Sequence, residues 1–339
     1  MRKTRIKAEN GIGCYHVTSR IVDRSFKMDE GEREIFRHIL RKAETFSGVS
    51  VLTYAILSNH FHILLDVPVQ PVLDDAELLR RVRALYGSAE ASLYKERWDV
   101  WRSGGIDVLV EREQAQLCQR MGDVSPFMKL LKQRYSISYN QRHKRTGTLW
   151  EGRYASILVE GESRALSTVA AYIDLNPVRA GIVKDPAEYR WSGYGEACGG
   201  SAVARQGLFA VQSSSLTQDA SWSDAAAAYR TCLFTRGEEH RDEGGRLLRV
   251  GFSPEDAQKV IDQGGRMALP DLLRCRVRYF RDGLAFGSKT FVETVFEKNR
   301  AHFGSKRKTG ARKIRFCLAE GLCIARDLRV TPVSIPLRA

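Results

Sequence analysis

The sequence predicts an α+β domain in residues 1–195, a linker at 196–224 and a mostly helical, basic domain at 225–339. In the first range, short runs rich in β-branched and aromatic residues alternate with longer amphipathic runs, which predicts mixed strands and helices. The second range is rich in Gly, Ser and Ala, a composition typical of linkers. The third range shows helical patterns with an excess of basic residues.

The first predicted elements are a strand and a helix. Residues 14–22 (CYHVTSRIV) have β-branched and aromatic character, which favours a strand. Residues 29–47 place Ile35, Ile39 and Leu40 at helical spacing and carry acidic residues at their start, which favours a helix.

A β-hairpin is predicted next. Two apolar runs at 49–59 and 60–68 are separated only by the polar pair Ser58 and Asn59, which favours a turn between two strands. The pattern at 74–87 then predicts another helix.

The rest of the first domain is less regular. Residues 88–124 are charged and irregular, which indicates an insertion or loosely packed helices. We expect a long basic helix at 125–145 and a short strand at 154–161. A helix at 162–183, broken at Asn176 before a proline, completes the domain.

Net charge is the strongest global signal in the sequence. The chain has 54 Lys and Arg against 40 Asp and Glu, a formal net charge of +14. In residues 271–330 alone, 15 basic residues stand against 6 acidic ones. Such a surplus favours a polyanionic partner such as nucleic acid, and a generally basic solvated surface is the alternative.

The cysteine pattern and the hydropathy of the sequence indicate the cellular compartment of the protein. The seven cysteines are scattered and form no CxxC pair, which argues for a reducing cytosol and against a disulfide framework or a zinc finger. No apolar run approaches the roughly 18 to 20 residues that a membrane span needs. We therefore expect a cytoplasmic, nucleoid-associated protein that has no membrane partner.

Two histidines in the second strand of the hairpin are the first candidate site. His60 and His62 are two residues apart, so their side chains share one face of a strand, with Phe61 and Ile63 on the other. Two imidazoles on one face can bind a metal ion together. The alternative is a chance pair of histidines at a polar strand edge.

The stretch AAYIDLNP (170–177) is the second candidate. Tyr172 and Asn176 are four residues apart and therefore share one helical face. A phenol is a potential nucleophile, and an amide oxygen is a reasonable ligand for a divalent ion. The alternative is a core tyrosine followed by an asparagine that only ends the helix.

The motifs NHFHILLDVP (59–68) and AAYIDLNPVRAGIV (170–183) together resemble the single-tyrosine HUH transposases, most closely the REP-associated tyrosine transposases. About 110 residues separate the two motifs, and a basic helix and the stretch GTLWEGRYASILVE lie between them, as in that family. The stretch YHVTSRIVDRSF (15–26) also resembles the opening strand of the family. The resemblance covers about residues 10–195, and it is specific because it combines the motifs.

This resemblance implies a fold and a reaction. The fold would be ferredoxin-like, an antiparallel sheet with helices, with the histidines on a central strand. Mg²⁺ or Mn²⁺ held by His60, His62 and Asn176 would polarise a scissile phosphate. Tyr172 would attack that phosphate and form a 5′-phosphotyrosine intermediate. The substrate would be single-stranded DNA, often folded into hairpins, and relatives include both dimers and monomers, so a homodimer stays open.

Three other tyrosines, Tyr135, Tyr139 and Tyr154, compete as nucleophiles. Only Tyr172 has a potential ligand one turn away and matches the family motif. No acceptor for the second ring nitrogens of the histidines is identified. Asp66 shares their strand parity, but a surface carboxylate is the alternative.

Basic residues between and beside the motifs are candidates for contacts with the DNA backbone, and Trp150 or Tyr154 are candidates for base stacking. For each of them the alternative is a solvated helix face, with Trp150 in the core. The basic candidates are Lys129, Lys132, Arg134, Arg142, Lys144, Arg145, Arg153 and Arg179.

Three functions are weighed. The leading hypothesis is a transposase-like nuclease and strand transferase that acts on single-stranded DNA. The second is a regulator with the same fold that binds structured nucleic acid without cutting. The third is a metallohydrolase that uses an HxH pair on a barrel strand, which would require many strand–helix repeats and further metal ligands that the sequence does not show.

Overall fold

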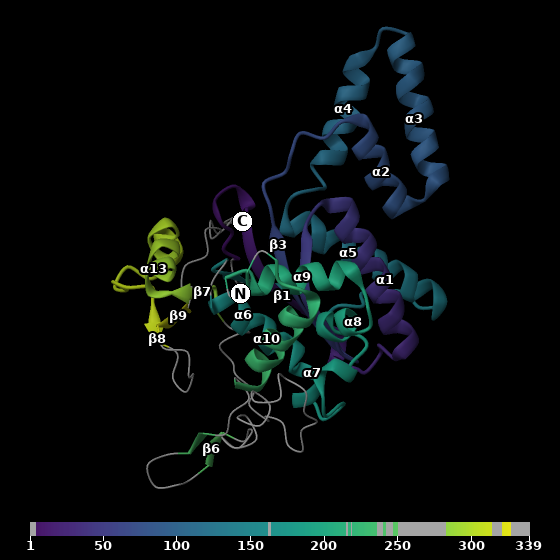
Figure 1. Cartoon of the computed structure of the whole chain (residues 1–339). Helices are drawn as coiled ribbons and strands as arrows, with labels where there is room; N and C mark the ends of the chain where they lie inside the picture. The colour runs from purple at the N-terminus through teal and green to yellow at the C-terminus, as the bar shows by residue number, and fades with distance from the viewer. Residues whose placement is uncertain are drawn as a thin grey trace, which may run out of the picture.

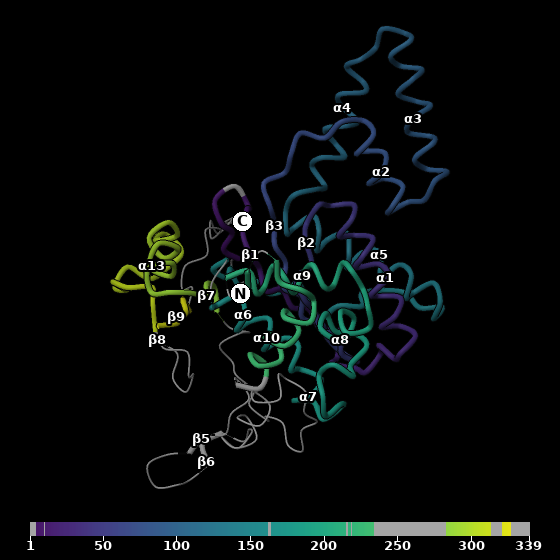
Figure 2. Tube along the Cα trace, in the orientation of Figure 1, coloured from purple at the N-terminus to yellow at the C-terminus, as the bar shows by residue number. Residues whose placement is uncertain are grey.

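The chain has a central sheet with helices on both sides and a helical arm that projects from one end (Figure 1), and its path is easiest to follow in the Cα trace (Figure 2). In the part that the structure describes, no helix is both long and apolar enough to cross a membrane. This computed structural model describes residues 5–161, 164–214, 216–217, 219–235, 240–241, 247–249, 283–313 and 321–326.

Four strands and two helices form the centre of the fold, in the chain order β-α-β-β-α-β. The strands lie in the order β2-β3-β1-β4, and all three neighbouring pairs are antiparallel. This is a ferredoxin-like arrangement, so the predicted α+β fold class is confirmed. The elements are β1 (Gly13–Arg20), α1 (Glu30–Ser47), β2 (Ser50–Ile56), β3 (His60–Val67), α5 (Val124–Arg142) and β4 (Ala155–Val159).

Local signals explain the first elements. The side chain of Asp29 caps α1 by accepting a hydrogen bond from the backbone N–H of Glu32, and Gly48, with φ of 69°, ends the helix. The backbone N–H of Leu57 donates to the carbonyl of His60 at 2.8 Å and closes the turn between β2 and β3. The predicted hairpin is therefore present.

The sheet has two covered faces. On one face, α1 and α5 pack onto β-strand residues such as Phe61 and Ile63. On the other face, helices from residues 164–235 pack onto residues such as Leu64 and Ile157. The helices on this second face are α6 (Arg164–Asp174), α7 (Asn176–Arg179), α8 (Gly193–Cys198), α9 (Ala202–Gln212) and α10 (Trp222–Thr235).

The range 196–224, expected as a linker, contains the packed helix α9. Gly207 of α9 lies against β2 so closely that a Cβ at this position would be 2.5 Å from the carbonyl oxygen of Leu52. Small residues are needed where a helix approaches a strand this closely. The Gly- and Ala-rich composition here therefore reflects close packing, and the range is not a linker throughout.

The range 88–124, expected to be irregular or loosely helical, contains two regular helices. With α2, they form the arm that projects beyond the sheet (Figure 1). In α3 only Ala91 and Trp98 are buried, so the apolar periodicity that marks a helix is weak there. The arm consists of α2 (Asp75–Tyr86), α3 (Ser88–Ser103) and α4 (Asp107–Cys118).

The described parts of 225–339, expected to be mostly helical, also extend the sheet. Strand β7 pairs in parallel with β4, and β9 and β8 follow it, so the sheet has seven strands. These strands are two to four residues long, too short for a period-two pattern to stand out in the sequence. The elements are β7 (Ala285–Ser288), α13 (Lys289–Lys298), β8 (Arg312–Lys313) and β9 (Leu322–Ala325).

Smaller elements complete the described chain. Strands β5 and β6 pair with each other in a separate two-stranded sheet. Their bounds and those of the short 3-10 helices are β5 (His240–Arg241), β6 (Leu247–Arg249), η1 (Glu9–Gly11), η2 (Val22–Arg24), η3 (Pro186–Glu188) and η4 (Arg300–His302).

Candidate active site

His60 and His62 lie on one face of the sheet. Both are on β3, and their ring centres are 5.2 Å apart. Phe61, between them, belongs to the core on the opposite face. The register with β1 places Thr18 opposite His62 and Arg20 opposite His60. The alternation that the i, i+2 spacing predicts is therefore present.

Tyr172 lies against this histidine face. It is on α6, and its ring centre is 5.9 Å from that of His62 and 6.1 Å from that of His16. The tyrosine is 9% exposed and His62 is 2% exposed, so the contact is at the margin of the buried interior. Two motifs about 110 residues apart in the sequence therefore meet in space.

Asn176 lies at the break between α6 and α7. Its side-chain nitrogen donates to the carbonyl oxygens of Tyr172 at 3.0 Å and Ile173 at 3.2 Å. Because the amide nitrogen makes both of these hydrogen bonds at the helix end, the amide oxygen is the atom that could ligate a metal ion. The side chain of Asn176 is thus held against the backbone of Tyr172 and Ile173.

Arg179 places its charge over the nucleophile candidate. The guanidinium carbon is 4.2 Å from the ring centre of Tyr172, within the range of a cation–π contact. The guanidinium also donates to the carbonyl oxygen of Tyr172. We expected Arg179 to contact the DNA backbone, and the structure shows that it packs on the tyrosine.

Each histidine has a partner that the sequence analysis did not identify. Nδ1 of His60 is 2.6 Å from Oδ1 of Asn59, and Nδ1 of His62 is 2.9 Å from Nε2 of His16. Asn59 is next to His60 in the sequence and could have been found from that adjacency. His16 lies near His62 only because of the β1–β3 register, which the sequence alone does not give.

Asp66 shares the histidine face, as its parity predicts. Its Oδ1 is 3.6 Å from the sulfur of Cys14, which is on the neighbouring strand β1. Asp66 is four residues beyond His62, towards the end of β3 that is remote from His60.

His60, His62 and Asn176 carry donor types that a divalent metal ion accepts. Within the described ranges, no three His, Cys, Asp or Glu side chains come together in a group that could hold a metal ion. The chain would supply two imidazoles and the amide oxygen of Asn176, and water or phosphate oxygens would complete the coordination. The hydrogen of His60 lies on Nδ1 in its bond to Asn59, which leaves the Nε2 lone pair that a metal requires. The residues therefore fit such an ion.

The basic helix α5 lies on the other face of the sheet from Tyr172. Arg142 forms an ion pair with the buried Glu32 at 2.7 Å, and the guanidinium carbon of Arg134 is 4.6 Å from the ring centre of Tyr86. These two arginines, expected to contact DNA, therefore make structural contacts within the chain.

Lys132 and Trp150 also make internal contacts. The ammonium of Lys132 donates to the carbonyl of Gly152 at 2.7 Å, and burial lowers its pKa to about 8. The indole N–H of Trp150 donates to the hydroxyl of Ser136 at 2.7 Å, and the ring is in the core beside Phe36. The core alternative for Trp150 is therefore correct, and the stacking role is not supported.

The remaining basic candidates are close to the surface. Arg145 donates to the carbonyl of Thr148 at 3.0 Å. Lys129, Lys144 and Arg153 are exposed and stay candidates for phosphate contacts.

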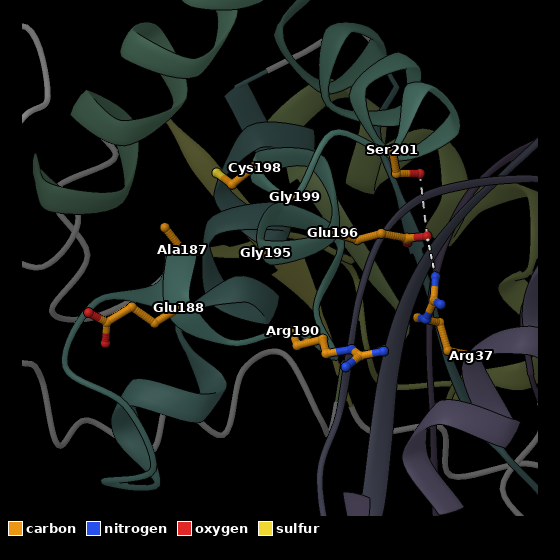
Figure 3. Close-up of a pocket in the computed structure, with 9 residues that line it drawn as sticks. All are labelled: Arg37, Ala187, Glu188, Arg190, Gly195, Glu196, Cys198, Gly199 and Ser201. Carbon is orange, nitrogen blue, oxygen red and sulfur yellow. Dashed lines mark hydrogen bonds and ion pairs between the residues drawn. The ribbon is translucent and has the colours of Figure 1, made fainter. Parts of the chain in front are cut away.

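A separate hollow of about 640 Å³ lies between α1 and the segment 187–201 (Figure 3). There Glu196 accepts hydrogen bonds from Arg37 at 2.9 Å and from Ser201 at 3.4 Å. Burial alone would raise the pKa of Glu196, but Arg41, Tyr54 and Arg37 together hold it below its usual value. Arg37 and Glu196 in this hollow are therefore already paired with each other, and the residues that line it include none of the histidine face.

Comparisons with known proteins give neighbours only among solved structures. One is a REP-associated tyrosine transposase bound to a REP hairpin, with 14% identity over 60% of this chain and 88% of that chain, and a TM-score of 0.37. Another is a putative transposase from Deinococcus radiodurans R1, with 18% identity over 51% of this chain and 96% of that chain, and a TM-score of 0.24. These two structures are described as transposases.

No protein-family model matches the chain, and no curated protein matches it. The fold itself is assigned from the strand order and pairing described above.

Proposed function

We propose that this chain is a transposase-like endonuclease and strand transferase that cuts single-stranded DNA and holds one cut end on Tyr172. The contact between the two motifs carries the proposal, because the Tyr172 ring lies 5.9 Å from His62 although about 110 residues separate them. A phenol beside imidazoles on a rigid sheet face has the components of nucleophilic attack on a metal-polarised phosphate.

In the proposed reaction, the phenol oxygen of Tyr172 attacks the scissile phosphorus and forms the P–O bond of a 5′-phosphotyrosine. The bond from phosphorus to the 3′-oxygen breaks, and this oxygen takes up a proton as the phenol loses one. Strand transfer is the reverse attack by a 3′-OH, so the reaction needs no external energy source. A phenolate is a better leaving group than an alkoxide, which keeps the link reversible.

The chain's own residues prepare this attack. The Arg179 guanidinium, 4.2 Å from the Tyr172 ring centre, stabilises negative charge as the phenol loses its proton. Asn176 bonds to the Tyr172 carbonyl and so fixes the end of α6. Mg²⁺ or Mn²⁺, when held by His60, His62 and Asn176, would supply Lewis-acid polarisation of the phosphate.

The proposed substrate is single-stranded DNA that contains a hairpin. The motif resemblance and the net charge of +14 support this choice. Lys129, Lys144 and Arg153 are the proposed backbone contacts, because they are exposed. A homodimer, and an accessory DNA-binding role for residues 225–339, stay predictions. Of that region, residues 236–239, 242–246, 250–282, 314–320 and 327–339 lie outside the described residues.

Cleavage of a labelled library of single-stranded hairpins, with Mn²⁺ or Mg²⁺, tests the proposal. The wild type should form a covalent protein–DNA adduct that survives denaturation, and Tyr172→Phe should form none. Tyr154→Phe is the matched control, since Tyr154 is also buried and its hydroxyl bonds to that of Ser125 at 3.1 Å. This control should keep the adduct.

Two outcomes would contradict the proposal. An adduct that persists in Tyr172→Phe would move the nucleophile to another residue. Tight hairpin binding with no adduct under either metal ion would favour the regulator that binds without cutting.

A further inference from the structure

A third histidine lies behind the histidine pair, and the proposed reaction does not use it. His16, on β1, is 1% exposed. Its ring stacks on that of His62, with centres 5.1 Å apart and planes 22° apart, and its Nε2 is 2.9 Å from Nδ1 of His62. A buried imidazole is costly unless it is hydrogen-bonded, so this contact requires an explanation.

The sheet itself brings the two rings together. In the β1–β3 register Thr18 is opposite His62, and His16 is two positions further along β1, opposite Leu64. His16 is therefore on the same face as His62 and diagonal to it, which is within reach of aromatic side chains. Both strands are central in the sheet. The backbone hydrogen bonds between β1 and β3 therefore fix the His16–His62 contact, and no loop is needed to hold it.

A hydrogen bond between two neutral imidazoles has a direction, and the direction sets the tautomer of both rings. When Nδ1 of His62 donates, the lone pair of His62 is on Nε2, where a metal can bind. When Nε2 of His16 donates, the hydrogen of His62 is on its own Nε2, which then cannot bind a metal.

We propose that His16 is a positioning residue that accepts a hydrogen bond from Nδ1–H of His62 and so holds His62 in the tautomer that binds metal through Nε2. This inference rests on the proposed function, because it takes His62 as a metal ligand. Asn59 Oδ1 does the same for His60 at 2.6 Å. Each histidine of the pair then has its own acceptor on Nδ1, an arrangement that orients metal ligands and raises their basicity.

The first measurement is the tautomer of His62 in the wild-type protein without metal or DNA. A two-bond ¹H–¹⁵N correlation spectrum of the histidine rings distinguishes a ring protonated on Nδ1 from one protonated on Nε2. The proposal expects Nδ1–H for His62, and Nε2–H would overturn it.

The second measurement is Mn²⁺ binding by the DNA-free protein, in the wild type and in two variants of His16. His16→Leu removes the acceptor, and its Mn²⁺ affinity should fall roughly 10- to 100-fold, the usual effect of losing such a partner. His16→Gln keeps an oxygen that can accept the bond, so its affinity should stay within a few-fold of the wild type. Cys14→Ala, on the same strand and face and also buried, is the control and should bind as the wild type does.

The results of these measurements show separately whether the role of His16 and the proposed function are correct. Wild-type Mn²⁺ affinity in a folded His16→Leu protein would overturn the positioning role. If His16→Leu does not fold, the wild-type spectrum and the His16→Gln affinity decide. A wild-type protein that shows Nδ1–H on His62 but binds no Mn²⁺ would support the role of His16 and count against the metal in the proposed function.

Discussion

Arg179 places a positive charge beside the ring of Tyr172. It lies over the ring at 4.2 Å and also bonds to the backbone carbonyl of the same residue. In Arg179→Ala we expect the rate of adduct formation to fall by about a hundredfold, the effect of removing one group that stabilises developing charge. Hairpin affinity should fall only a few-fold, because the proposed backbone contacts are the exposed residues Lys129, Lys144 and Arg153. Single-turnover cleavage and a binding titration measure the two effects.

The variant Arg179→Lys distinguishes the effect of the positive charge from the effect of the planar guanidinium group. The ammonium keeps the positive charge but loses the planar group that stacks on the ring and donates to the carbonyl, so the rate should lie between those of the wild type and Arg179→Ala. An Arg179→Ala protein that cleaves at the wild-type rate but binds DNA weakly would show that Arg179 acts only in DNA binding.

For single residues, the sequence predicts those side-chain positions that depend on spacing within one strand or one helix. Strand parity gives the shared face of His60 and His62, and helical spacing places Asn176 one turn from Tyr172. The sequence does not predict His16, because its contact with His62 depends on register between strands that are far apart in the chain. It leaves two positions open for Trp150, since a tryptophan in a basic stretch fits a core and a stacking surface equally well, and the structure places the ring in the core.

Helix α6, which carries Tyr172, is tied to three other elements through Asp174. This carboxylate is fully buried and accepts hydrogen bonds from the hydroxyls of Thr53 and Tyr229 and from the backbone N–H of Tyr194. Burial raises the pKa of Asp174 to about 7, although these donors act to lower it. The position of α6, which carries the proposed nucleophile, therefore depends on bonds to a buried carboxyl group whose pKa is raised.

The raised pKa of Asp174 predicts a pH dependence of stability. Between about pH 4 and pH 7 the unfolded chain ionises this group while the folded protein keeps it protonated, so the free energy of unfolding falls as pH rises through this window. Asp174→Asn has no such group. The stability of the wild type relative to Asp174→Asn should therefore fall from pH 4 to pH 7, by on the order of 4 kcal/mol. Urea unfolding at several pH values measures this difference.

A carboxyl group on α10 provides a control of opposite sign. Bonds from Ser221 lower the pKa of the exposed Asp224, so its contribution is present at neutral pH and is lost only as pH falls below about 4. The stability of the wild type relative to Asp224→Asn should therefore be constant from pH 4 to pH 7. A constant difference for Asp174→Asn as well would mean that Asp174 stays ionised in the folded protein.

For whole elements, the sequence predicts those with strong local patterns. The hairpin of β2 and β3 and the capped helix α1 are such elements. The sequence predicts a linker where α9 lies, because packing on β2 requires the small residues that also mark linkers. Strands β7 and β9 do not stand out in the sequence because they are short, and β7 pairs with β4, which lies more than 100 residues earlier in the chain.

The candidate active site and the helical arm lie at opposite ends of strand β3. The histidines are at the start of β3, and the arm follows the end of the same strand. The eight residues of β3 correspond to roughly 25 Å at about 3.3 Å per residue. The arm also has its own apolar cluster, which includes Trp98 and Leu117. The arm and the site are therefore built as separate parts.

The two ends of the arm meet at the body. A Cβ on Gly122 would lie 2.3 Å from the Cγ of Gln70, and the backbone N–H of Gly122 donates to the carbonyl of Ser47 at 2.9 Å. A short Gly/Ser linker can therefore replace residues 71–121 without moving the sheet. Phe46 of α1 is fully buried and packs against the arm, so the deletion would expose it. Its lost burial costs about 2–3 kcal/mol, and Phe46→Gln in the deletion variant avoids an exposed aromatic ring.

We expect the deletion variant that carries Phe46→Gln to unfold in one cooperative transition and to form the Tyr172–DNA adduct in the hairpin assay. Circular dichroism during urea unfolding measures the first property, and the denaturing gel measures the second. Full-length Phe46→Gln is the control, because it separates the loss of the phenyl ring from the loss of the arm. A deletion variant that does not fold would show that the arm is part of the core. A folded variant that binds hairpins but forms no adduct would show that the arm positions the DNA for cleavage.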